Sequence, residues 1–116
     1  MVVDDEEPIL FAMHDYFTAH GWQVDCAQAI EEAKSLADAN EYDVVITDLH
    51  LTGVHEAEGL DLVRFVRSRG SAKVIVFTAY ATNELEQSAL QLGAHAFLQK
   101  TTPIAEIAKL LAALSA

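Results

Sequence analysis

Acidic side chains follow two apolar segments of this chain, at points where strands are expected to end. Residues 44–48 read VVITD, so four strand-forming residues lead directly into Asp48, and Val3 leads into Asp4 and Asp5. An ionised carboxylate at the end of an apolar strand must be solvated, paired or bound to a metal ion, because an unpaired charge is costly to remove from water. We therefore expect these three acids to have partners.

The elements that must position these acids alternate between short apolar strands and amphipathic helices. Five strands are predicted at residues 1–4, 23–27, 43–48, 73–78 and 96–99. Five helices are predicted at residues 8–20, 29–39, 60–69, 83–92 and 103–114. Proline stands in the first turn of the first and last helices, and glycine follows the first, third and fourth, as is usual at helix starts and ends.

Strands separated by single helices form right-handed crossovers and a parallel sheet that is covered on both faces. This predicts a five-stranded α/β sandwich. Ligands of such sheets collect beyond the carboxyl ends of the strands. At that edge Asp4, Asp5 and Asp48 are joined by Thr78, which ends the fourth strand, and by Lys100, which follows the fifth. The pattern therefore predicts one cluster of three carboxylates, a hydroxyl and an ammonium.

The composition fits one compact domain over residues 1–116 and excludes several function classes. Hydrophobic residues make up 52% of the chain and charged residues 22%, which argues against intrinsic disorder. The net charge of −11 repels phosphate backbones and anionic lipid, so direct nucleic acid binding by this segment and membrane binding are not expected. The apolar runs are too short to span a bilayer and no signal-peptide pattern opens the chain, so a cytoplasmic location is the default expectation.

Four stretches of the sequence carry a family resemblance: VVDDEEP, VVITDLHL, VIVFTAYA and GAHAFLQK. Each is weak alone, but their order, with an acid, hydroxyl or lysine at the end of a strand, is specific. The chain resembles the receiver domain of two-component response regulators over essentially its whole length. The resemblance implies a flavodoxin-like, doubly wound parallel sheet with strand order 2-1-3-4-5 and five helices.

The resemblance also implies a metal site. In receivers the acidic pair matching Asp4 and Asp5 anchors the metal, and the acid matching Asp48 and the backbone carbonyl matching that of His50 complete the protein ligands. Asp5 and Asp48 are expected to touch the ion, with Asp4 acting through water. Crowded carboxylates repel one another unless a cation neutralises them, and hard oxygen ligands favour Mg²⁺. Mg²⁺ is therefore the expected cofactor.

By the same resemblance, Asp48 accepts a phosphoryl group from a histidine kinase or a histidine phosphotransfer protein. Negative charge accumulates on the oxygens of a phosphoryl group in transit, so the site must supply positive charge and hydrogen-bond donors. Lys100 and Thr78 match the family residues that do so. The chain is thus expected to be a phosphoacceptor signalling domain that assists its own phosphorylation and dephosphorylation, not an enzyme acting on outside substrates.

A conformational switch is implied as well. After phosphorylation Thr78 is expected to move toward the new oxygens, and Phe97 to turn inward into the vacated space. The surface of the fourth helix, fifth strand and fifth helix would then change, and receivers commonly use this surface for homodimers or other partners. The coupling is only as strong as the differential stabilisation of the two states by the phosphoryl group.

The first helix suggests a docking surface. Its predicted buried stripe comprises Ile9, Ala12, Met13, Tyr16 and Phe17. This leaves Phe11 near the opposite face, where an aromatic residue is unexpected. Because phosphodonors of this family dock beside the first helix, Leu10 and Phe11 are predicted to contact the kinase or phosphotransfer protein.

Two segments depart from the family pattern. The stretch from Asp48 to Gly59, taken as the glycine that leads the third helix, is long, and its residues His55, Glu56 and Glu58 are predicted to shield the site or to form a passive surface loop. Receivers typically have proline after the lysine, with a cis bond, whereas Thr101 follows here. A cis bond before a residue other than proline costs roughly 2.5–4 kcal/mol, which leaves both isomers open.

Two bulky residues, His50 and Tyr80, occupy the positions that flank the phosphoryl site in receivers. They predict slow hydrolysis of the phosphorylated form, since such positions tune the access of water.

Other interpretations remain open on the sequence alone. Asp4 and Asp5 could be an acidic cluster favoured by the dipole of the first helix, and the whole chain could be a pseudo-receiver that binds partners without phosphorylation. An aspartyl-phosphate hydrolase expects a second aspartate where His50 stands. Flavin binding is disfavoured because VVDDEEP would repel the cofactor phosphate.

Overall fold

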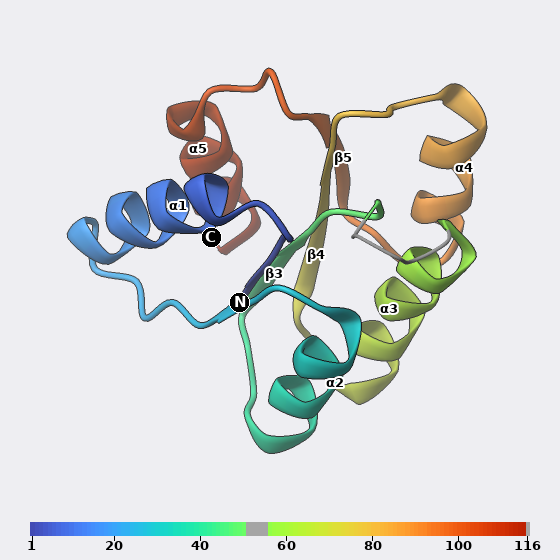
Figure 1. Cartoon of the computed structure of the whole chain (residues 1–116), viewed down its shortest axis with the longest axis horizontal. Helices are drawn as coiled ribbons and strands as arrows, with labels where there is room; N and C mark the ends of the chain where they lie inside the picture. Colours follow the sequence, from blue (N-terminus) through green and yellow to red (C-terminus); the bar gives the residue numbers. More distant parts are fainter. Residues whose placement is uncertain (51–55, 116) are drawn as a thin grey trace.

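The computed structural model describes residues 1–50 and 56–115, and it has the expected doubly wound α/β architecture (Figure 1). Five parallel strands form one sheet in the order β2-β1-β3-β4-β5. The strands are β1 (Val2–Val3), β2 (Cys26–Ala27), β3 (Val44–Thr47), β4 (Lys73–Thr78) and β5 (Ala96–Gln99). The predicted fold class and strand order are thus confirmed.

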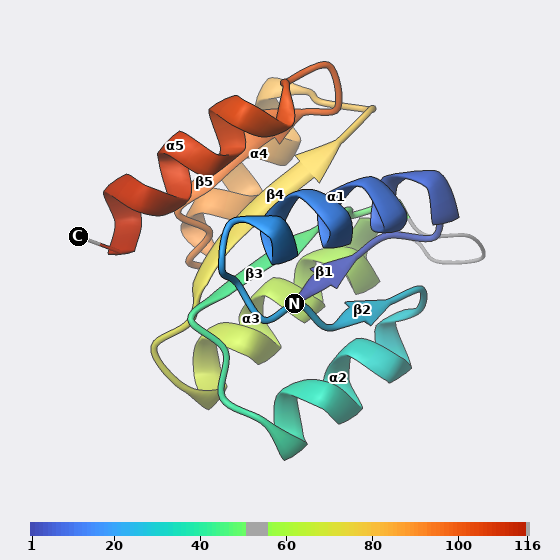
Figure 2. The ribbon, with the colours of Figure 1, turned by 90° about the vertical axis from the view of Figure 1, so that its left-hand side faces the viewer.

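Helices cover both faces of the sheet, with α1 and α5 on one side and α2, α3 and α4 on the other (Figures 1 and 2). Their bounds are α1 (Glu7–Ala19), α2 (Ile30–Ala39), α3 (Glu56–Arg69), α4 (Asn83–Gln91) and α5 (Ile104–Ser115). No helix within the described part of the chain is both long and apolar enough to cross a bilayer.

The core divides into two hydrophobic clusters because successive strand residues point to opposite faces. Ile46 of β3 and Ile75 of β4 pack in the cluster beneath α1 and α5. Val45, Val74 and Val76 of the same strands pack in the cluster beneath α2, α3 and α4. Both faces of β3 and β4 are therefore apolar, which explains why these strands read as continuous apolar runs in the sequence.

Several predicted boundaries differ from the structure. The bounds of β4 and β5 match the prediction, whereas β2 pairs with β1 only through Cys26 and Ala27 and is shorter than residues 23–27. The third helix begins at Glu56, not at residue 60, so Gly59 lies inside α3 and does not lead it. The stretch after Asp48 is therefore partly helix.

Gly59 is required by the close approach of α3 to the chain that follows β3. A Cβ atom at this position would lie 2.5 Å from the carbonyl oxygen of Leu49 and 2.9 Å from its Cα. Only glycine allows the helix to pack directly on this backbone. The contact fixes the segment immediately after Asp48.

The buried stripe of α1 is also different from the predicted one. Leu10, Met13 and Phe17 are buried, whereas Ala12 is exposed and Ile9 is only half-buried. The spacing of three and then four residues is that of a narrow helical stripe, which faces the sheet and α5. The prediction was wrong about Ala12 because it centred the stripe one residue away from its actual line.

Candidate functional site

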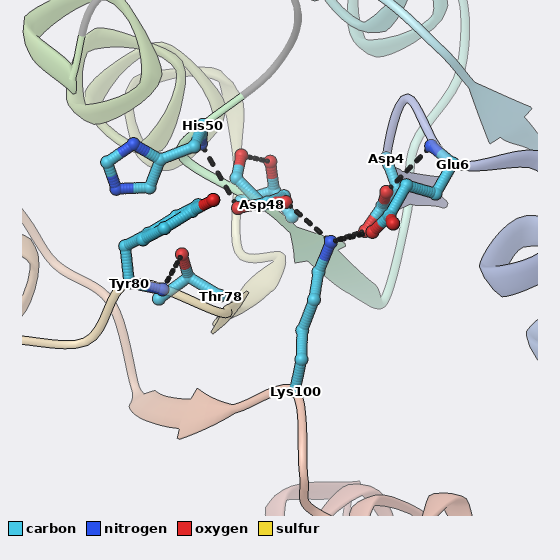
Figure 3. A network of polar contacts seen from close by, with 8 residues as sticks. Asp4, Glu6, Asp48, His50, Thr78, Tyr80 and Lys100 are labelled. Atoms are coloured by element: carbon cyan, nitrogen blue, oxygen red, sulfur yellow. Dashed lines mark hydrogen bonds and ion pairs between the residues drawn. The ribbon is translucent and has the colours of Figure 1, made fainter.

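The side chains singled out in the sequence gather at the carboxyl ends of the strands (Figure 3). Asp4 follows β1, Asp48 follows β3, Thr78 ends β4 and Lys100 follows β5. Two main-chain hydrogen bonds extend the sheet to this edge: the N–H of Asp48 donates to the carbonyl of Val3 at 3.0 Å, and that of Lys100 donates to the carbonyl of Thr78 at 3.0 Å. The sheet itself therefore sets the positions of the acid and the lysine.

Lys100 stands at the centre of the site. Its Nζ lies 2.7 Å from Asp48 Oδ2, 2.9 Å from Asp4 Oδ2 and 2.7 Å from Glu6 Oε2. The side chains of Asp4 and Asp48 are only 2% and 4% exposed, whereas that of Glu6 is 56% exposed. The ammonium thus neutralises two buried acids and one that faces solvent.

The peptide bond between Lys100 and Thr101 is trans, which decides the alternative that the sequence left open. The chain turns just after β5, and the N–H of Thr102 donates to the carbonyl of Gln99 at 2.9 Å. Lys100 and Thr101 occupy the two central positions of this turn. The turn directs Lys100 back over the end of the sheet without a cis bond.

Asp48 is surrounded by polar atoms at the open end of its carboxylate. Its Oδ1 accepts a hydrogen bond from the N–H of His50 at 3.1 Å, while Oδ2 contacts Lys100. A carboxylate has about four lone-pair directions, so these contacts leave acceptor capacity on both oxygens. Asp48 is therefore buried by a polar site and not sealed beneath apolar packing.

Burial and charge act in opposite directions on the titration of this cluster. Burial raises the pKa of Asp4, and the hydrogen bonds from the Glu6 N–H and from Lys100 offset only part of this rise. Burial by itself lowers the pKa of Lys100, but the hydrogen bonds to Asp48, Glu6 and Asp4 outweigh it and raise the pKa above its usual range. Lys100 is therefore positively charged throughout the neutral range.

The acidic residues fit a divalent cation. Carboxylate oxygens of Asp4, Asp5 and Glu6 lie within 4.8 Å of one another. Oxygens of Asp4 and Asp48 also contact the same atom, the Nζ of Lys100, so they are near enough for one cation to bridge them. A set of carboxylate oxygens is the donor type that Mg²⁺ prefers. The predicted carbonyl ligand, that of His50, comes two residues after Asp48.

Glu6 was not among the residues predicted for the site. It immediately precedes α1 and its backbone is extended, with φ −92° and ψ 108°. The signal that could have identified it is its position: it is the residue after the acidic pair and before a helix that starts with Glu7 and Pro8, so it faces the same edge of the sheet.

Aromatic and hydroxyl side chains complete the site on the side of β4. The Oγ1 of Thr78, which is fully buried, accepts a hydrogen bond from the N–H of Tyr80 at 3.3 Å. The rings of His50 and Tyr80 meet edge to face with centroids 5.0 Å apart, although Tyr80 is 68% exposed. Both bulky residues therefore lie beside Asp48, as predicted, and touch each other. Phe97 of β5 is half-buried against the cluster beneath α4.

The remaining predicted residues fall away from this cluster. Phe11 is 73% exposed on α1, whereas Leu10 is 7% exposed, so Leu10 cannot offer a large contact area to a docking partner. His55 lies outside the described residues, as does any shielding segment built from 51–55. Glu58 is exposed on the first turn of α3.

Known proteins resemble this chain in sequence and fold. A family model described as response regulator receiver domain matches residues 1–112. The photosynthetic apparatus regulatory protein RegA of Cereibacter sphaeroides is 29% identical over 97% of this chain, and the sensory/regulatory protein RpfC of Xanthomonas campestris pv. campestris is 30% identical over 99% of it. The chain spans 60% of the length of RegA and 16% of that of RpfC.

Among solved structures, a response regulator protein from Burkholderia pseudomallei superposes with a TM-score of 0.88 and 28% identity, over 95% of this chain and 64% of that one. That structure contains a phosphorylated aspartic acid, a calcium ion and citrate.

Proposed function

Because the chain belongs to the response regulator receiver family, whose members are phosphoacceptor signalling modules, we propose that Asp48 accepts a phosphoryl group from a phosphorylated histidine. The observation that carries this proposal is the placement of Lys100, which contacts Asp48 Oδ2 at 2.7 Å and Asp4 Oδ2 at 2.9 Å at the end of the sheet. The phosphorylated aspartic acid in the Burkholderia pseudomallei relative supports it.

The reaction is a displacement at phosphorus. An oxygen of the Asp48 carboxylate attacks the phosphorus of the donor, the new O–P bond forms and the P–N bond to the donor histidine breaks. The electron pair of that bond stays on the imidazole nitrogen. Lys100 stabilises the negative charge on the equatorial oxygens, and the main-chain N–H of His50, already 3.1 Å from Asp48 Oδ1, fixes the orientation of the carboxylate.

Asp4, Asp5 and Asp48 would hold Mg²⁺, with the carbonyl of His50 as a further ligand. A bound Mg²⁺ supplies positive charge that stabilises the transferring phosphoryl oxygens. The contribution of the chain is the pre-formed group of carboxylates, which Lys100 keeps together in the absence of the ion.

Phosphorylation is expected to act on partners through the same elements that build the site. The N–H of Lys100 donates to the carbonyl of Thr78, so a movement of the end of β4 is transmitted to β5 and Phe97. We therefore assign the switch to Thr78 and Phe97 and its readout to the surface of α4, β5 and α5, where a homodimer or another partner would bind. Docking of the histidine-containing donor is assigned to Phe11 on α1.

Incubation with Mg²⁺ and acetyl phosphate, followed by intact-mass measurement, tests the phosphoacceptor function. The wild-type protein should gain one phosphoryl group only when Mg²⁺ is present, and Asp48→Asn should gain none. Asp43→Asn is the matched control, because Asp43 is an exposed aspartate at the opposite end of β3. An adduct that persists in Asp48→Asn, or no adduct on the wild type, would contradict the proposal. The latter result would favour the pseudo-receiver alternative.

A further inference from the structure

All three donors of Lys100 are engaged by carboxylates. A lysine ammonium has three N–H groups and no acceptor, and Nζ has three carboxylate oxygens at 2.7–2.9 Å, from Asp4, Glu6 and Asp48 (Figure 3). A phosphoryl oxygen arriving at Asp48 therefore finds no free donor on this lysine. One of the three ion pairs must weaken before Lys100 can turn fully to the new group.

The three carboxylates differ in what it costs to release them. Asp4 and Asp48 are almost completely buried, so the loss of their cation would leave an uncompensated charge inside the protein. The side chain of Glu6 is 56% exposed, so water can replace the ammonium there at little cost. Glu6 is thus the partner that Lys100 can exchange.

The local structure holds Glu6 in position for this contact. The N–H of Glu6 donates to Asp4 Oδ1 at 2.9 Å, and its carbonyl accepts from the first turn of α1. Its side chain makes no capping hydrogen bond to the helix, although Glu6 occupies the N-cap position. Instead it reaches Lys100, 94 residues further along the chain.

We propose that Glu6 is a positioning residue that retains Lys100 in the unphosphorylated protein and competes with the phosphoryl group for its ammonium. The inference deepens the proposed function of Asp48 and rests on it. Glu6 also places a negative charge beside the incoming anion. Both effects disfavour the phosphorylated state relative to the unphosphorylated one, so Glu6 lowers the extent of phosphorylation that a given donor can achieve.

Neutralising Glu6 should therefore favour the phosphorylated state. Glu6→Gln keeps the size of the side chain and should be phosphorylated about two- to fivefold faster by acetyl phosphate, and it should bind beryllofluoride with Mg²⁺ about two- to fivefold more tightly, as expected for one exposed ion pair. Glu7→Gln is the matched control, because it removes the same charge one residue away from a side chain that contacts Gln28. It should leave both quantities unchanged.

A second measurement needs neither phosphate nor metal. In ¹⁵N-labelled, metal-free protein, the ammonium protons of Lys100, assigned by their loss in Lys100→Arg, should exchange with water faster in Glu6→Gln than in the wild type or in Glu7→Gln. Unchanged exchange in Glu6→Gln, unchanged or weaker beryllofluoride binding, or an equal effect of Glu7→Gln would overturn the inference. If the wild type takes up no phosphoryl group at all, the proposed function fails, whereas the exchange measurement still decides whether Glu6 retains Lys100.

Discussion

Lys100 Nζ lies 2.7 Å from Asp48 Oδ2 although the peptide bond that follows Lys100 is trans. The turn closed by Gln99 and Thr102 supplies the chain direction that a cis bond provides in typical receivers. The ammonium is consequently placed between the buried acids of β1 and β3, and the stability of the site depends on it.

Removal of the Lys100 charge should destabilise the metal-free protein. Lys100→Met leaves Asp4 and Asp48 buried without a cation, so the free energy of unfolding should fall by about 3 kcal/mol. Mg²⁺ should recover more stability in this variant than in the wild type, since it restores the missing charge. Urea unfolding with and without Mg²⁺ measures both effects.

The control for this experiment is Lys109→Met. Lys109 pairs with Glu106 on the exposed surface of α5, so this change should alter stability by less than about 0.5 kcal/mol. Equal stabilisation of wild type and Lys100→Met by Mg²⁺ would show that the ammonium and the metal do not serve the same carboxylates.

Gly59→Ala should destabilise the fold by about 2 kcal/mol, because the new Cβ would meet the backbone of Leu49 at 2.5 Å. Gly70→Ala is a suitable comparison, since a Cβ at Gly70 has no heavy atom within 4 Å and its φ is not positive. Thermal unfolding of both variants should show a loss for Gly59→Ala alone; a similar melting temperature for the two would argue against the tight packing of α3.

His95 should make the stability of the β4–β5 pair sensitive to acid. The N–H of Val74 donates to Nδ1 of His95 at 3.1 Å, and the N–H of His95 donates to the carbonyl of Val74 at 2.7 Å. Protonation of Nδ1 removes the acceptor and leaves the N–H of Val74, a fully buried residue, without this hydrogen bond. Burial, Arg67 on α3 and Lys73 on β4 all lower the pKa of His95 below its usual 6.5.

Because the folded-state pKa is lower than the unfolded one, this contribution to stability is complete above pH 6.5 and is lost as the pH falls from 6.5 toward the folded-state pKa. His95→Asn can present its side-chain oxygen to the same N–H but does not titrate. Urea unfolding between pH 8 and pH 5 should therefore show a steeper loss for the wild type than for His95→Asn, on the order of 1 kcal/mol per pH unit at most. Parallel profiles would exclude the effect.

Phe11→Ala should slow phosphotransfer from the cognate histidine-containing donor by at least about fivefold, as expected for an exposed aromatic anchor in an interface. The rate with acetyl phosphate should not change, because Phe11 does not belong to the site. Leu90→Ala on α4 removes another exposed apolar side chain and serves as the control. An equal loss with both phosphodonors would refute docking at Phe11.

Tyr80→Ala should shorten the lifetime of phosphorylated Asp48 several-fold, since it removes the ring that packs against His50 and opens the site to water. Tyr80→Phe keeps the ring and should decay at the wild-type rate. The decay of the phosphorylated species, followed by intact mass after removal of acetyl phosphate, distinguishes the two. Identical decay in Tyr80→Ala would mean that the ring does not limit water access.

The sequence by itself determined the layered architecture and the edge at which the site lies. Apolar strands of period two and helices of period 3.6 are local patterns, and they identified all five strands and all five helices. The positions of Asp4, Asp48, Thr78 and Lys100 at strand ends followed from the same patterns, because the carboxyl ends of parallel strands meet at one edge of a sheet.

The tertiary structure decided the contacts that these patterns do not encode. Glu6 meets Lys100 across 94 residues, and the trans turn after Lys100 depends on a hydrogen bond between Thr102 and Gln99. The burial of Leu10 and the exposure of Ala12 depend on the rotation of α1 against the sheet and α5. Such features result from the packing of distant segments, and a difference of one residue in register or rotation changes which side chain is buried or paired.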